Sequence, residues 1–151
     1  MQAFIFDPIL LGIAFAPFVY VLLLIFLPND WPSWLVLLAG FFIGCCVDFI
    51  FFSGGIHAAA CTLIAFLRLL FIRAVFSETM APENLNVEQE SFSGLLRYVI
   101  LLVVAHHFVV FVFVVGNVDR FGWFLNAWLI NSLLTILAVS LILLLTRNSK
   151  R

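Results

Sequence analysis

The stretch that decides the fold is residues 40–73, which read GFFIGCCVDFIFFSGGIHAAACTLIAFLRLLFIR. Its two apolar runs are joined by Gly54 and Gly55, so the stretch predicts a hairpin of two membrane helices. Small residues recur on one face of each predicted helix, where they let two helix backbones approach closely. The residues of this predicted seam are Gly40, Gly44 and Asp48 on the first helix, and Ala58, Cys61 or Thr62, and Ala65 on the second.

Three polar side chains lie within this apolar hairpin: Asp48, His57 and Arg68. Because polar groups are costly inside a membrane, each of them needs a partner or a function. Asp48 and His57 flank the turn at similar depth, so we expect a hydrogen bond between them. Arg68 lies about 16 Å below His57 by helix rise, and we expect it to extend toward the cytoplasmic headgroups. Asp48 and His57 could form a proton or substrate site, but a pair that locks the hairpin or caps its turn is the favoured interpretation.

The composition indicates an integral membrane protein. The 151 residues are 66% hydrophobic and only 10% charged, and the mean hydropathy is +1.26. Soluble domains are typically about half apolar and about a quarter charged. The apolar runs are continuous rather than alternating, which favours helices over a membrane barrel. The net charge of −1 and the lack of a basic groove argue against a nucleic-acid partner.

We therefore predict an all-α, polytopic membrane protein with a single domain over 1–151 and about five spans. A polar loop with four glutamates (Glu78, Glu83, Glu88 and Glu90) is expected between the third and fourth spans, over 77–93. The predicted spans cover residues 9–27, 33–52, 56–76, 94–115 and 122–146.

Lysine and arginine placement predicts the orientation, because cytoplasmic loops carry an excess of these residues. A cytoplasmic C-terminus and five spans put the N-terminus on the periplasmic side. Only Arg120 then lies outside. The residues on the inner side are Arg68, Arg73, Arg97, Arg147, Lys150 and Arg151.

Outside the hairpin, polar residues occur in the last two spans. His106 and His107 point about 100° apart on a helix, so at most one faces a given site, and interhelical hydrogen bonding is favoured over metal ligation. Asn131 and Thr135 share a face and are expected to bond between helices. The chain has no nucleophile–base constellation, glycine-rich phosphate loop or HExxH spacing. We therefore expect no catalytic residues, no cofactor and no metal site.

Several segments together resemble the rod shape-determining protein MreD family, in particular its Bacteroidetes form. They are 17–20 (PFVY), 27–30 (LPND), the helix from Gly40 to Asp48, 54–68 (GGIHAAACTLIAFLR) and the histidine pair at 106–107. The resemblance covers most of the chain from residue 17 onward and is most specific from Asp48 to Arg68. Members usually carry one more helix before the 17–20 region, so five helices would be one fewer than the family pattern of six. The start of the chain at Met1 could then be misassigned or shortened.

The resemblance implies a non-catalytic inner-membrane component of the rod complex, or elongasome. Such a protein binds MreC, works with MreB, RodA and a penicillin-binding transpeptidase, and helps to organise lateral peptidoglycan synthesis and rod cell shape. The family fold resembles the substrate-binding subunits of energy-coupling-factor transporters, so a vitamin-type transporter subunit is the alternative. A lipid-handling protein that uses Arg68 and Arg73 is a third possibility. The candidates for helix packing and for the partner interface are Gly40, Gly44, Asp48, Gly55, His57, Ala58, Arg68 and His106.

Overall fold

The computed structural model describes residues 18–76, 90–115 and 121–149. All regular secondary structure in these ranges is helical, which confirms the predicted all-α class. The described helices are α2 (Val21–Ile25), α3 (Ser33–Phe51), α4 (Ile56–Phe76), α5 (Phe92–Val115) and α6 (Phe121–Ser149). Four of them, α3 to α6, are long and apolar enough to cross a membrane. The chain is therefore a multi-pass membrane protein.

The last four predicted spans agree with α3, α4, α5 and α6 to within a few residues. The fourth span begins at Phe92 rather than at residue 94, because the Ser91 hydroxyl accepts a hydrogen bond from the Gly94 N–H and caps the helix there. The predicted loop over 77–93 is therefore too long at its end, and its residues 77–89 lie outside the described part. The last helix extends past the predicted 146 to Ser149.

The first predicted span, over 9–27, is only partly tested, since residues 1–17 lie outside the described part. Residues 18–27 do not form a long helix. They contain α2, which has five residues and ends before the turn at 26–32. Pro28 and Pro32 lie in this turn, and neither can continue a helix that needs its backbone N–H.

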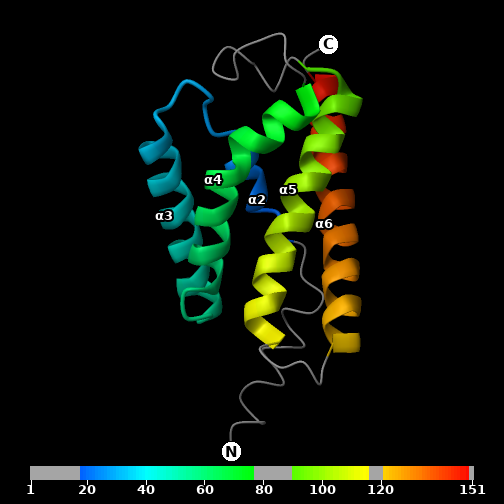
Figure 1. The fold of residues 1–151 in the computed structure, drawn as a ribbon. Helices are drawn as coiled ribbons and strands as arrows, with labels where there is room; N and C mark the ends of the chain where they lie inside the picture. The colour runs from blue at the N-terminus through cyan, green and yellow to red at the C-terminus, as the bar shows by residue number, and fades with distance from the viewer. Residues whose placement is uncertain (1–17, 77–89, 116–120, 150–151) are drawn as a thin grey trace, which may run out of the picture.

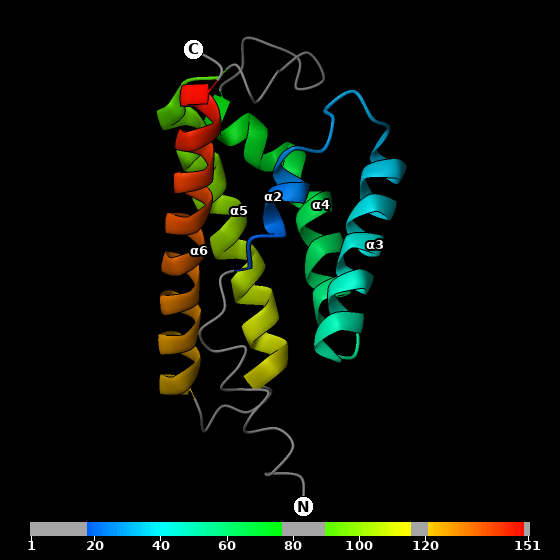
Figure 2. The ribbon, with the colours of Figure 1, turned by 180° about the vertical axis from the view of Figure 1, so that it is seen from behind.

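The four long helices stand in a row in the order α3, α4, α5, α6, with neighbours antiparallel (Figure 1). Seen from behind, α2 lies on one face of this row, against α4 and α5 (Figure 2). Its side chains Val21, Leu24 and Ile25 are fully buried there. The short segment is thus part of the core.

Helix α3 occupies one edge of the row and packs mainly against α4. In both views the C-terminal turns of α4 lean away from α3 and toward α5 and α6 (Figure 1, Figure 2). The two helices therefore contact closely near their shared turn and separate toward the other end.

Candidate functional site

The turn between α3 and α4 is held by the carboxylate of Asp48. This carboxylate accepts hydrogen bonds from the backbone N–H groups of His57 (3.0 Å) and Ala58 (2.8 Å), and from the Ser53 hydroxyl (2.5 Å). The first N–H groups of a helix have no partner within the helix, and a carboxylate also suits the positive end of the helix dipole. Asp48 therefore caps α4 across the turn. Gly54 and Gly55 make the turn possible with φ angles of 69° and 97°.

The structure thus corrects the predicted Asp48–His57 contact in one respect. Asp48 bonds the backbone of His57 and not its imidazole. Of the two interpretations from the sequence, the cap of the turn is the one that the geometry supports.

Below the turn, α3 and α4 meet along the predicted seam. A Cβ atom built on Gly44 would lie 2.5 Å from the His57 carbonyl oxygen and closer still to the backbone of Ala58. A Cβ on Gly40 would lie 2.8 Å from the Ala65 side chain and 3.0 Å from the Cys61 carbonyl oxygen. The missing side chains let the two backbones touch, as expected for small residues in a membrane interface.

Three polar side chains, Tyr20, His57 and His106, are linked by hydrogen bonds in the core, on the side of α4 that faces away from α3. The Tyr20 hydroxyl is 2.6 Å from Nδ1 of His57 and 3.0 Å from Nε2 of His106. Cys61 Sγ lies 3.8 Å from the same His106 nitrogen. His57 and His106 are almost completely buried, with 1% and 0% of their surfaces exposed. Tyr20 therefore joins α4 to α5 through one hydroxyl group.

His107 faces a different direction from His106, as the helical geometry predicts. Its Nδ1 lies 2.8 Å from the Val103 carbonyl oxygen, and its Nε2 lies 3.2 Å from the Thr135 hydroxyl on α6. The Thr135 oxygen also accepts a hydrogen bond from the Phe18 backbone N–H at 3.0 Å. The prediction of interhelical bonding by His106 or His107 and by Thr135 is confirmed.

The prediction that the Arg68 side chain extends outward from the bundle toward the headgroups is wrong, because the side chain is folded inward against the segment before α3. Only 2% of its surface is exposed. Its guanidinium donates to the Tyr98 hydroxyl (3.2 Å), to the Pro28 carbonyl oxygen (3.2 Å) and to the Leu27 carbonyl oxygen. The turn after α2 leaves these carbonyl groups without helical partners, so it draws the side chain inward.

The side chains of His57, His106, Thr135 and Arg68 share one feature that the sequence did not reveal: each forms a hydrogen bond with the segment 18–28. Phe18, Tyr20, Leu27 and Pro28 are bonded to α6, to α4 and α5, and to Arg68 of α4. Tyr20 and Tyr98 were missed because tyrosine is common near membrane interfaces and their positions gave no pairing signal. The segment 18–28 is thus hydrogen-bonded to three of the long helices, α4, α5 and α6.

Removal of the Tyr20 hydroxyl tests whether the segment 18–28 holds these helices together. Tyr20→Phe leaves Nδ1 of the buried His57 without its partner and Nε2 of the buried His106 with only the Cys61 sulfur at 3.8 Å, and the loss of a partner by a buried polar group costs about 1–3 kcal/mol. We expect a clear loss of thermal stability in detergent, larger than that of Tyr98→Phe, which removes a single hydrogen bond. Equal melting temperatures for the two variants would contradict the joining role of Tyr20.

Comparison of the chain with known protein families, with curated proteins and with solved structures finds no match. The resemblance to the MreD family therefore stays a prediction based on the residues quoted above.

Proposed function

We propose that this chain is a non-catalytic component of the bacterial rod complex that binds MreC in the plane of the inner membrane and helps to organise lateral peptidoglycan synthesis. The resemblance at 40–68 supports this proposal, together with the exposed outer face of α3. MreB, RodA and a penicillin-binding transpeptidase are the proposed wider partners, as in the family.

The outer face of α3 is the observation that carries the proposal. Leu38, Phe42 and Phe49 are exposed by 44%, 58% and 79%. At about 100° per residue, these three side chains lie on one stripe of the helix, opposite Gly40 and Gly44. The hairpin thus packs internally through its small residues and presents a ridge of large ones. A single membrane helix, such as the one that MreC-type proteins carry, can pack along this ridge.

The eight candidates from the sequence occupy other places. Seven of them (Gly40, Gly44, Asp48, His57, Ala58, Arg68 and His106) are buried inside the described bundle, and Gly55 is exposed at the turn. Their proposed role is to hold the hairpin in the shape that presents the ridge.

The proposed orientation uses the same arrangement. Arg73 at the end of α4, Arg97 at the start of α5 and Arg147 at the end of α6 belong to one end of the bundle (Figure 1). Arg147 also donates a hydrogen bond to the Glu90 carbonyl oxygen at 2.7 Å. By the positive-inside rule this end is cytoplasmic and the α3–α4 turn is periplasmic.

Co-purification with the MreC-type protein of the same organism tests the proposal. We expect the tagged chain to retain MreC, and Phe42→Ala combined with Phe49→Ala to reduce the retained MreC at least about tenfold, since large interface side chains dominate binding. The matched control is Leu133→Ala combined with Leu141→Ala, which removes two exposed side chains of α6. This control should retain MreC as the unaltered chain does.

Two results would count against the proposal. One is an absence of MreC from the purified complex together with thermal stabilisation by a vitamin-type solute, which would favour the transporter alternative. The other is an equal loss of MreC from the α3 and α6 variants.

Asp48 and the Nδ1 atom of His57, which a substrate site at the outer end would use, already have partners inside the protein.

A further inference from the structure

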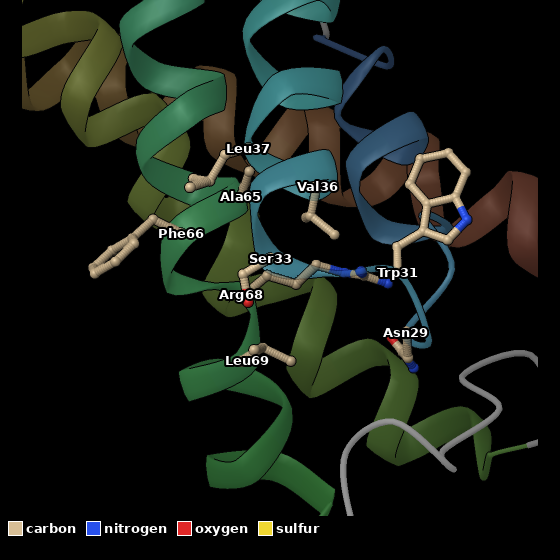
Figure 3. A pocket seen from close by; sticks show the side chains of 9 residues that line it. All are labelled: Asn29, Trp31, Ser33, Val36, Leu37, Ala65, Phe66, Arg68 and Leu69. Carbon is tan, nitrogen blue, oxygen red and sulfur yellow. The ribbon is translucent and has the colours of Figure 1, made fainter.

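A groove of about 190 Å³ opens between α3 and α4, at the end where the two helices separate (Figure 3). Its walls come from the first turns of α3, the turn before it, and the middle of α4. Most of the lining is apolar, with Arg68 as its charged group. The residues that line it are Asn29, Trp31, Ser33, Val36, Leu37, Ala65, Phe66, Arg68 and Leu69.

Arg68 reaches across this groove from α4. In Figure 3 its side chain passes Ser33 and ends near Trp31 and Asn29. A guanidinium group carries five N–H donors. The hydrogen bonds to Tyr98, Pro28 and Leu27 use three of them. Two of the five donors therefore form no hydrogen bond with these three residues, and Arg68 lines the groove although only 2% of its surface is exposed.

The positive charge of Arg68 is not neutralised by its known partners. Two carbonyl oxygens and a tyrosine hydroxyl are neutral acceptors, so they satisfy three N–H donors of the guanidinium but bring no negative charge beside it. The described residues include three acidic side chains, and none forms an ion pair with Arg68: Asp48 caps the turn at the other end of α3, Asp30 is exposed, and Glu90 precedes α5. An anion in the groove would supply the missing charge.

The position of the groove fits a lipid headgroup. Trp31 and Trp34 lie at this end of α3 and are partly or largely exposed, as is typical of residues at a membrane interface. Val36, Leu37 and Leu69 line the groove, and the Phe66 ring beside them is 68% exposed. A ligand there needs an anionic head at interface depth and an apolar tail that extends along α3 and α4.

We propose that this groove binds an anionic phospholipid, with its phosphate on the two remaining donors of Arg68 and an acyl chain along Phe66 and Leu69. The site is separate from the ridge proposed for MreC, which lies on the opposite side of α3. The bound lipid gives Arg68 an ionic partner and fills the space between α3 and α4 where their direct contact ends.

Native mass spectrometry of the purified, delipidated chain tests this proposal. The probes are phosphatidylglycerol, phosphatidylcholine with the same acyl chains, diacylglycerol, and glycerol phosphate. We expect phosphatidylglycerol to bind at least tenfold more tightly than each of the other three. Equal binding of diacylglycerol would show that the phosphate plays no part, and equal binding of glycerol phosphate would show a soluble anion site. Either result would overturn the proposal.

Two pairs of variants locate the site. Arg68→Gln should reduce phosphatidylglycerol binding at least tenfold, whereas Arg73→Gln, which removes an exposed arginine from the same helix, should not. Since Arg68 also holds the turn after α2, a second variant keeps its hydrogen bonds intact. Leu69→Trp fills the groove and should block the lipid, whereas the same substitution at the exposed Leu70 should not. Loss of binding in both members of a pair, or in neither, would overturn the proposed location.

Discussion

Asp48→Ala is expected to lower the free energy of unfolding by roughly 2–6 kcal/mol. The substitution leaves the backbone N–H groups of His57 and Ala58 without an acceptor, and each buried, unpaired donor costs about 1–3 kcal/mol. Both hydrogen bonds are buried, so water replaces them poorly. We expect the α3–α4 hairpin to open at its turn and the thermal transition in detergent to fall accordingly.

Two milder substitutions at the same turn are expected to lose less stability than Asp48→Ala. Asp48→Asn keeps one carbonyl oxygen as an acceptor and should lose an intermediate amount of stability. Ser53→Ala removes only one of the three hydrogen bonds to the carboxylate, from a half-buried residue, and should lose the least. Thermal unfolding monitored by size-exclusion chromatography measures the order. If Asp48→Ala were no worse than Ser53→Ala, the carboxylate would not be the cap of α4.

Gly44→Ala is the second substitution with a large expected effect. The added methyl group would lie 2.5 Å from the His57 carbonyl oxygen and closer still to the backbone of Ala58. Because these atoms belong to a helix backbone, they cannot move aside without separating α3 from α4. Overpacking of this kind costs about 1–3 kcal/mol. We expect a lower melting temperature and a weaker α3–α4 contact.

The matched control for Gly44→Ala is Gly122→Ala in the first turn of α6. A Cβ atom there meets nothing within 4 Å, and alanine favours a helix over glycine by about 1 kcal/mol. The same substitution is therefore expected to lower stability at Gly44 and to leave it unchanged or raise it at Gly122. A change of equal sign at both positions would contradict the close approach of the two backbones.

The seam and the turn were predictable because they depend on local features of the sequence. In an apolar run, glycine indicates a close approach of two backbones, as at Gly40 and Gly44, or a turn, as at Gly54 and Gly55. Helix geometry then fixes which residues share a face with Gly40 and Gly44. The depth of Asp48 near the turn was equally local. The identity of its hydrogen-bond donors was not, since the backbone and the imidazole of His57 lie at similar depth.

The position of Arg68 shows what the sequence left open. Helix rise placed the residue near one membrane interface, and an arginine there usually extends to the headgroups. The turn after α2, forty residues earlier in the chain, offers carbonyl oxygens at that point and draws the guanidinium inward. Nothing near Arg68 in the sequence carries this information.

The sequence by itself determined that the chain is an all-helical membrane protein, where its four long helices lie, and which face of the 40–73 hairpin is packed. Hydrophobic length and small-residue spacing act within one helix or between neighbours, so they can be read without a fold. Only the tertiary structure decided that residues 18–28 join three helices, that Tyr20 bridges two histidines, and that the outer stripe of α3 remains exposed. These arrangements depend on contacts between residues far apart in the chain, which are set by how the helices pack.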